Sequence, residues 1–246
     1  MTQVHGKGTT VLYNGVNLSG DLTSFDFSQS ADTVDTSTMD PATNQDHKFI
    51  VGMRNGTMTS NAIWNDAAGA IDETIIANLG ATGPFCGMFI PNNTENSRAY
   101  AGTNVILTSY NVSGSVSDAV KAVFNWQSSG GFLGGMLLHE FAAETTAASS
   151  TAVRDSGVDL TYPTTLGGRV VFIVTSITGG NVVMALQHAT TIGGSYTTVT
   201  TLSTLTAPGV ASAIIDPGTN LNEFVRATWT QTASSWTGAL VFTRFV

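Results

Sequence analysis

The chain has 246 residues and a formal net charge of −8, and only 11% of its residues are charged. A hydrophobic share of 42% supplies a core and excludes a disordered chain. Nine Lys and Arg against 17 Asp and Glu exclude a general basic surface for nucleic acid. So few charges on so long a chain indicate that much of the surface is covered by other subunits. Gly, Thr, Ser and Asn take the place of charge and favour strands and turns, so we predict a mainly β protein.

Sequence motifs give no support for catalysis or for a bound cofactor. The sequence contains no phosphate-binding loop, dinucleotide fingerprint, zinc-protease motif or nucleophile elbow, so we predict neither an enzyme nor a cofactor. The single cysteine, Cys86, excludes an intrachain disulfide and is predicted to be a buried, inert thiol. No signal pattern and no run of 18 apolar residues occur, so we expect no membrane insertion.

A change in composition divides the chain into two predicted modules. Residues 142–156 are almost all small or polar, which is typical of a linker between domains 1–141 and 157–246. The first module holds twelve acids and five bases, a net charge of −7, whereas residues 146–246 hold four of each. This asymmetry predicts two modules with different electrostatic roles.

The first module is predicted to consist of strands and one helix. Strands are expected at 9–13, 48–51, 57–64, 84–90, 99–110, 119–127 and 132–139, with turns at Asn14-Gly15 and at 54–56. The helix is expected over 68–79, because Ile71, Ile75 and Leu79 recur every fourth residue and Gly80 stops it.

The second module reads as an immunoglobulin-like or jelly-roll β-sandwich. Strands are expected at 169–177, 181–187, 196–202, 210–215, 223–229 and 239–245, separated by Gly, Pro and Asn. Tyr196 and Trp236 are candidates for stacking on a glycan, since Trp236 lies in a polar segment typical of a loop tip. His139 follows an apolar strand and is expected to be solvated or capping.

One acidic polar stretch lies within residues 26–46. Its spacing allows three interpretations: a calcium site, a solvated loop, or a loop that contacts a neighbouring subunit. We favour the third, and the candidate contact residues are Asp32, Asp35, Asp40, Asp46 and Lys48. No metal site is predicted.

Three segments of the first module carry a family resemblance: GKGTTVLYNGVNLSG (6–20), DTVDTSTMD (32–40) and HKFIVGMRNGTMTSNAIW (47–64). In these residues and in the order of its elements, the region 1–140 resembles the major tail tube protein of long-tailed bacteriophages with flexible tails. The resemblance implies a β-sandwich or half-barrel with one flanking helix, six copies in a ring, and rings stacked around a lumen that conducts double-stranded DNA. It also implies contacts between rings through the acidic loop.

The resemblance further implies other partners and a location. The partners are the tape measure, tail terminator and tail tip proteins, and the location is the virion tail after synthesis in the host cytoplasm. The second module is similar to the extra outer β-domain that some tail tube proteins carry. The alternative function is an adhesin or capsid decoration protein whose C-terminal sandwich binds carbohydrate.

Overall fold

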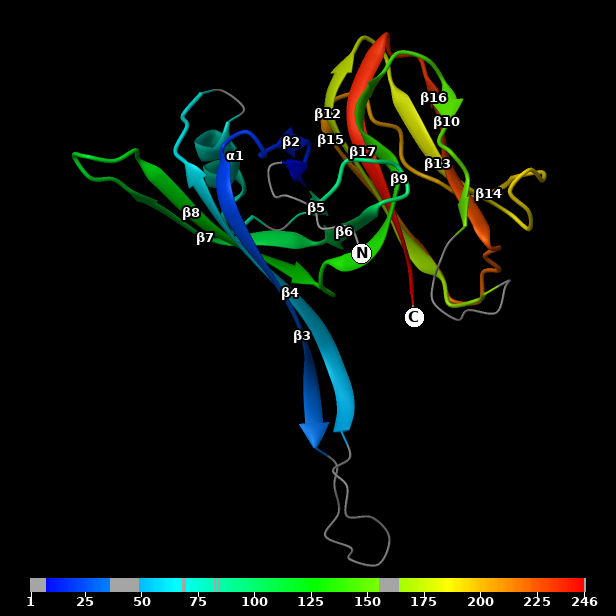
Figure 1. Ribbon diagram of the computed structural model, residues 1–246, viewed down its shortest axis with the longest axis horizontal. Helices are drawn as coiled ribbons and strands as arrows, with labels where there is room; N and C mark the ends of the chain where they lie inside the picture. Colours follow the sequence, from blue (N-terminus) through cyan, green and yellow to red (C-terminus); the bar gives the residue numbers. More distant parts are fainter. Residues whose placement is uncertain are drawn as a thin grey trace, which may run out of the picture.

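The computed structural model describes residues 8–35, 49–67, 70–81, 83, 85–154 and 164–245. Within these ranges the chain forms seventeen strands and one helix (Figure 1). This confirms the prediction of a mainly β protein with one flanking helix.

The central sheet has eight antiparallel strands that come from both halves of the chain. Its order is β15 (Gly209–Ile215), β12 (Gly168–Thr178), β17 (Ser235–Arg244), β9 (Leu133–Glu144), β6 (Arg98–Thr103), β5 (Cys86–Ile90), β1 (Thr10–Tyr13) and β2 (Val16–Asn17).

The central sheet is rolled, so that one of its faces encloses its own core. Leu12 and Met88 from one end of the strand order are buried in one cluster with Ile173 from the other end. The rolled sheet nearly closes at Gly15, in the predicted Asn-Gly turn. An ideal Cβ there would lie 2.5 Å from the backbone nitrogen of Gly209, and φ is +87°. Only glycine meets both conditions.

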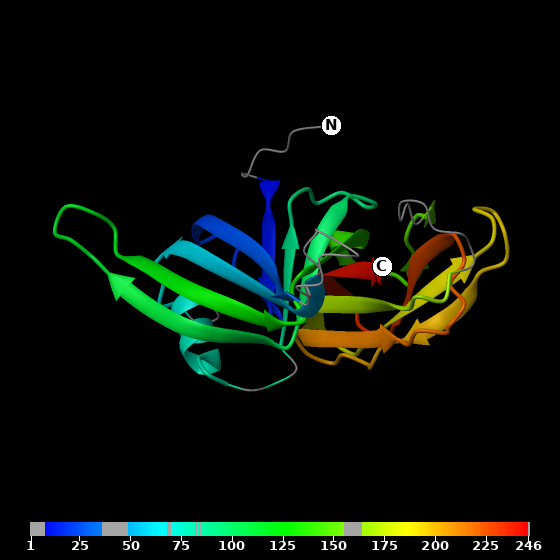
Figure 2. The same ribbon diagram turned by 90° about the horizontal axis from the view of Figure 1, so that it is seen from below.

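Two smaller sheets cover the outer face of the rolled sheet. The four-stranded sheet has the order β3 (Leu22–Asp35), β4 (Phe49–Ile63), β8 (Lys121–Ser129) and β7 (Val105–Ser113). The outer sheet has the order β10 (Ala148–Ser149), β16 (Phe224–Gln231), β13 (Val182–Ala189) and β14 (Thr197–Thr201), and β11 (Val153–Arg154) also pairs with β16. Figure 2 shows these two sheets on opposite sides of the molecule.

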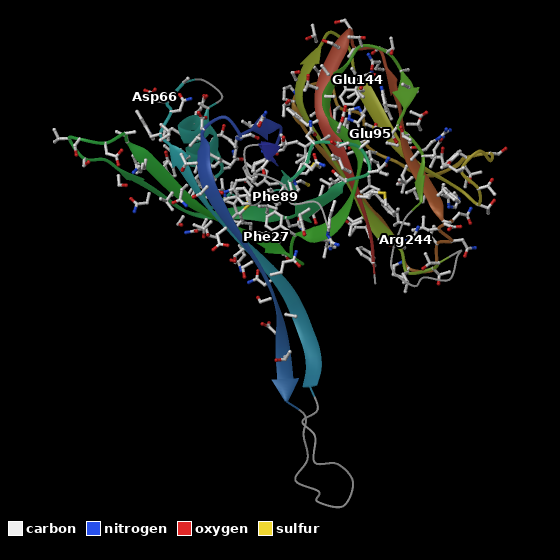
Figure 3. All side chains as sticks on the ribbon, viewed as in Figure 1. Phe27, Asp66, Phe89, Glu95, Glu144 and Arg244 are labelled. Atoms are coloured by element: carbon white, nitrogen blue, oxygen red, sulfur yellow. The ribbon has the colours of Figure 1, made fainter. Side chains whose placement is uncertain are left out.

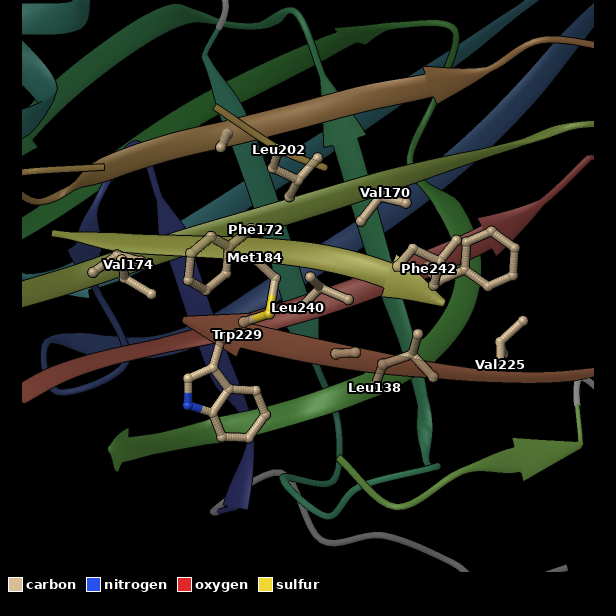
Figure 4. Packing of buried hydrophobic residues seen from close by; sticks show 14 of the residues in the cluster. Leu138, Val170, Phe172, Val174, Met184, Leu202, Val225, Trp229, Leu240 and Phe242 are labelled. Carbon is tan, nitrogen blue, oxygen red and sulfur yellow. The ribbon is translucent and has the colours of Figure 1, made fainter. Parts of the chain in front are cut away.

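Each small sheet closes a separate apolar core against the rolled sheet. Under the four-stranded sheet, Trp126, Phe124 and Phe132 are fully buried. Helix α1 (Ile71–Asn78) closes one end of this core with Ile71 and Ile75, as the i, i+4 spacing predicted. The prediction for Leu79 was wrong, because the helix ends at Asn78 and Leu79 is exposed. Under the outer sheet, aromatic and aliphatic side chains such as those of β12 and β17 interdigitate (Figure 4).

The boundary predicted between the modules crosses the rolled sheet. Strand β9 from the first half pairs with β6 on one side and with C-terminal β17 on the other. The segment predicted as a linker contains the end of β9 and both short strands that pair with β16. The division into modules stays a prediction, but the two halves share one sheet.

Three local predictions were wrong. Residues 54–56 form no turn, because β4 runs unbroken from Phe49 to Ile63. The single strand expected over 99–110 is two strands in different sheets, separated at Asn104, whose φ is +51°. The acidic stretch is not all loop, since β3 extends to Asp35.

Candidate assembly interface

The four-stranded sheet presents one face that no other described element covers. Its inward side chains, such as Met58, Phe124 and Trp126, lie in the core, and the alternate residues point outward. We call the outward set the polar face. It consists of Ser24, Asp26, Ser28, Ser30, Asn55, Thr57, Thr59, Asn61, Ile63, Ile106, Ser109, Asn111, Ser113, Lys121, Val123, Asn125, Gln127 and Ser129.

Hydrogen bonds between strands tie the polar face together. Thr59 Oγ1 donates to Asn125 Oδ1 at 2.6 Å, and Asn125 Nδ2 donates to Ser109 Oγ at 2.7 Å. In the next row Asn61 Nδ2 donates to Ser24 Oγ at 3.0 Å. These polar groups therefore have partners within the sheet and have less capacity left for an external ligand.

Charge is sparse on the polar face. Of its described side chains only Asp26 and Lys121 are ionisable, and the Lys121 ammonium forms an ion pair with Asp118. Lys121 holds the pKa of the exposed Asp118 below its usual value by hydrogen bonding and charge. The face therefore offers no unpaired cation to a polyanion within the part of the sheet that is described.

In the described part of the chain the four-stranded sheet is open along β3 and along β7 beyond Leu107. Strand β3 pairs on one side only. Strand β7 pairs with β8 on one side, and on its other side only its first residues are occupied, where Leu79 forms an isolated bridge with Leu107 and Val105 N donates to the Phe85 carbonyl. The far half of β3, from Ser28 to Thr33, is exposed on both faces, and the β3–β4 hairpin projects from the molecule (Figure 1). A two-stranded ribbon is only marginally stable in water, and a long open edge invites pairing with another chain.

An aromatic cluster lies where β3 meets the rolled sheet. The Phe25 and Phe89 rings are tilted against each other with centroids 4.5 Å apart, and the Phe27 and Tyr100 centroids lie 5.3 Å apart. All four rings are half-buried: Phe25 and Phe27 come from β3 at the base of the projecting hairpin, and Phe89 and Tyr100 come from β5 and β6 (Figure 3 labels Phe27 and Phe89). They anchor the hairpin at its base, whereas the side chains of Ser28 to Thr33 stay exposed.

Helix α1 fixes the other edge strand. Both Trp64 Nε1 and the Tyr110 hydroxyl donate to Asp72 Oδ1, the former at 3.0 Å. Burial and this hydrogen bond raise the pKa of Tyr110, so the phenol stays protonated and donating. No sequence motif pointed to Asp72, because its partners lie 8 and 38 residues away.

The predicted acidic contact residues fall mostly outside the described ranges. Asp32 lies exposed in β3, and Asp35 is the last residue of that strand. Asp40, Asp46 and Lys48 lie outside the described residues. Their role in contacts between subunits stays a prediction.

The prediction of Trp236 at an exposed loop tip was wrong. Trp236 belongs to β17, is fully buried, and donates from Nε1 to Gln231 Oε1 at 2.7 Å. A buried ring cannot stack on a sugar. Tyr196 is half-buried just before β14, and its glycan role stays a prediction.

His139 is not solvated, contrary to prediction. It is 1% exposed, its ring lies 4.8 Å from that of Trp229 and 4.9 Å from that of Trp236, and Nε2 lies 3.3 Å from Glu144 Oε1. Two register shifts in the β9–β17 pairing adjoin this residue. Burial lowers the pKa of His139, while Glu144 and Glu95 oppose that shift.

The lowered pKa of His139 predicts a pH-dependent stability. The folded state binds a proton less readily than the unfolded state, so the free energy of unfolding should fall as pH drops below about 6.5. The free energy of unfolding stops falling once the pH is below the pKa of His139 in the folded state. Urea unfolding at pH 7.5 and 5.0 should show a smaller difference for His139→Gln than for the native chain, whereas Glu144→Gln should enlarge it. Equal differences for native chain and His139→Gln would refute this role.

Cys86 is buried, as predicted, and burial raises the pKa of its thiol to about 11. Within the described residues no group of three His, Cys, Asp or Glu side chains is arranged to hold a metal ion. The described part of the chain contains no helix that is long and apolar enough to cross a bilayer.

No protein-family model and no curated protein matches the sequence. Among solved structures, a chain in the tail of an empty gene transfer agent particle is 20% identical, covering 53% of this chain and 97% of that one, with a TM-score of 0.40. The Dit protein of phage SPP1 is 12% identical over 97% of this chain and 99% of its own, with a TM-score of 0.35. Hcp1 from Salmonella typhimurium is 12% identical over 52% of this chain and 93% of its own, with a TM-score of 0.29. Each of these TM-scores is below 0.5, and none of these identities exceeds 20%.

Proposed function

We propose that this chain is a structural subunit of a phage-type tail tube. Copies join edge to edge through β3 and β7, and the polar face lines the lumen. The observation that carries the proposal is a sheet that is open along β3 and along β7 beyond Leu107, with one uncovered, nearly uncharged polar face among its described residues. The resemblance of residues 1–140 to tail tube proteins supports six copies in each ring.

Edge pairing between copies removes the hazard of the open strands. Because the four strands alternate in direction, β7 of one copy lies antiparallel to β3 of the next in a closed ring. Closure into a barrel leaves no free edge, and a closed ring is the common form of a soluble homo-oligomer. The projecting β3–β4 hairpin, with Asp32 and Asp35, then extends toward the adjoining ring.

The polar face suits a conduit for double-stranded DNA. Lys and Arg contacts with phosphates dominate DNA affinity, so a lumen that conducts DNA must present few of them. The one cation on the described face is paired with Asp118, and neighbouring amides and hydroxyls bond each other. In the virion tail the stacked rings would meet tape measure, terminator and tail tip proteins at their ends.

Exposed valines on the β7–β8 hairpin provide the test of assembly. Val112 on the edge strand is 42% exposed, and Val116 in the connecting turn is fully exposed. We expect the double variant Val112→Asp, Val116→Asp to fold normally, because neither side chain contributes to a core. It should fail to form tubes, because assembly would place two carboxylates in an apolar contact. Negative-stain electron microscopy and sedimentation at rising concentration measure the result.

Ile192→Asp is the matched control. Ile192 is 61% exposed and lies between β13 and β14 in the chain, and Figure 1 shows β14 on the opposite side of the molecule from the β7–β8 hairpin. The control should assemble like the native chain. Native tubes from the double valine variant would contradict edge pairing at β7, and a native chain that never forms rings or tubes would refute the proposed function.

A further inference from the structure

A row of polar side chains crosses three strands on the outer sheet. Arg226 of β16 pairs in register with Gln187 of β13, which in turn pairs with Thr198 of β14. Arg226 Nε donates to Gln187 Oε1 at 2.9 Å, and Gln187 Nε2 lies 3.5 Å from Thr198 Oγ1. The alternate residues of β16, including Val225 and Ala227, point into the core. The row therefore lies on the side of the outer sheet away from the rolled sheet.

Tyr196 holds the guanidinium of Arg226 in place. The Arg226 Cζ atom lies 4.0 Å from the centroid of the Tyr196 ring, and the Tyr196 hydroxyl donates to the carbonyl of Ile192 at 3.0 Å. The stacked ring and the amide oxygen of Gln187 restrain the guanidinium before any ligand arrives. A restrained Arg loses less conformational entropy on binding than a free one.

The charge of Arg226 is not neutralised within its own surroundings. Among the described residues no carboxylate forms an ion pair with Arg226, and its Nε contact to Gln187 leaves the Nη donors of the fork for other acceptors. A planar fork of donors matches a carboxylate or phosphate group. The arrangement thus supplies an anion-recognising group beside an aromatic ring and two neutral polar side chains.

The distribution of charge along the chain favours this location for an anionic ligand. Residues 164–246 hold three Arg and two acids, a net charge of +1, whereas residues 1–141 have a net charge of −7. A polyanion is repelled by the first region and not by the second. Strands β13, β14 and β16 of the outer sheet contain one Arg in total, and this residue is Arg226.

We propose that Arg226, Gln187 and Tyr196 form a binding site for an acidic saccharide, such as one of the uronate or phosphate-bearing polymers of a cell surface. The guanidinium contacts the anionic group, the exposed Thr198 hydroxyl hydrogen bonds to a sugar hydroxyl, and the accessible part of the Tyr196 ring contacts the sugar. Gln187 positions the guanidinium through its Oε1 atom. The site lies on the outer sheet, remote from the polar face, and is independent of the proposed tube function.

Isothermal titration calorimetry of the full chain at low salt tests the site with three oligosaccharides of equal length: an oligogalacturonate, a phosphorylated mannan oligosaccharide and a dextran. We expect at least one acidic probe to bind and dextran to bind at least tenfold more weakly. Arg226→Gln should reduce the affinity for the acidic probe at least tenfold. Arg226→Lys should restore only part of it, because an ammonium keeps the charge without the fork. The probe that binds tells uronate from phosphate recognition.

Arg98→Gln is the matched control, because Arg98 also lies over a tyrosine, with Cζ 5.6 Å from the Tyr100 ring centroid, but on β6. It should leave the affinity unchanged, and circular dichroism should show all variants folded. Absence of binding to both acidic probes, equal binding of dextran, or an equal loss in Arg98→Gln would each overturn the proposal.

Discussion

A chain that ends at Ala147 is expected to lose its cooperative fold. The truncation removes β17, which lies between β9 and β12 in the middle of the rolled sheet. It also removes Val171, Ile173 and Val241 from the core inside that sheet. The remaining residues of this core would face water on one side. We expect a soluble fraction near zero on expression and no urea transition by circular dichroism.

The expected size of this loss follows from the buried side chains. Fully burying one large aliphatic side chain stabilises a fold by about 1.5–3 kcal/mol. Three such side chains leave the inner core, and Leu12, Met88 and Leu137 lose their packing partners. The total approaches the about 5–15 kcal/mol that a domain typically has. The hydrogen bonds between β9 and β17 are lost as well.

Coexpression supplies the control for the truncation. Residues 1–147 and 148–246, produced as two chains in one cell, should combine into a soluble complex, because β9 and β17 then pair as they do in the intact chain. A fragment 1–147 that is soluble and unfolds cooperatively on its own would contradict the shared-sheet argument. It would instead support a first module that folds independently.

Local pattern predicted most strands of this fold. The apolar run at 169–177 became β12, and the Gly, Pro and Asn positions between later strands marked their ends within a few residues. The helix followed from Ile71 and Ile75, which both point into one core. These features depend on residues close in sequence, so periodicity is enough to find them.

Long-range pairing was beyond the reach of local pattern. Strand β9 and its partner β17 are about a hundred residues apart, and nothing in either segment specifies the other. The small, polar residues 142–156 therefore read as a linker, although part of this segment pairs with β16. Trp236 was predicted to lie in a loop for the same reason. The residues just before it are polar, although β17 begins at Ser235.

The candidate interface was only partly predictable. The acidic stretch predicted a subunit contact in the region of the β3–β4 hairpin. The polar face could not be predicted, because its composition depends on the register of four strands. Thr59, Asn125 and Ser109 meet only because β4, β8 and β7 are adjacent in the sheet. Such residues carry no motif, since each is an ordinary strand residue until its neighbours are known.

Asn125→Lys is expected to turn a conduit into a DNA-binding surface. Asn125 lies in the centre of the polar face, half-buried between Thr59 and Ser109. A lysine there would extend its ammonium out of the sheet, and ring symmetry would repeat it in every subunit of every layer. Each lysine that neutralises a phosphate strengthens binding and also makes it more sensitive to salt. The logarithm of the association constant falls by about 0.9 for each such contact when the salt concentration rises tenfold. Assembled variant tubes should therefore retain DNA strongly at 50 mM salt and release it at high salt.

Thr230→Lys separates the lumen from the outside of the tube. Thr230 is exposed on β16 of the outer sheet, so this variant carries the same added charge on the opposite side of the subunit. Retention of a fluorescent duplex shorter than the tube, measured by cosedimentation across a salt series, compares the two variants. Electron microscopy first verifies that both assemble, since Asn125→Lys also removes two hydrogen bonds. Equal retention by the two variants would place the polar face outside the lumen, because a charge that lines the path of the DNA contacts it on all sides.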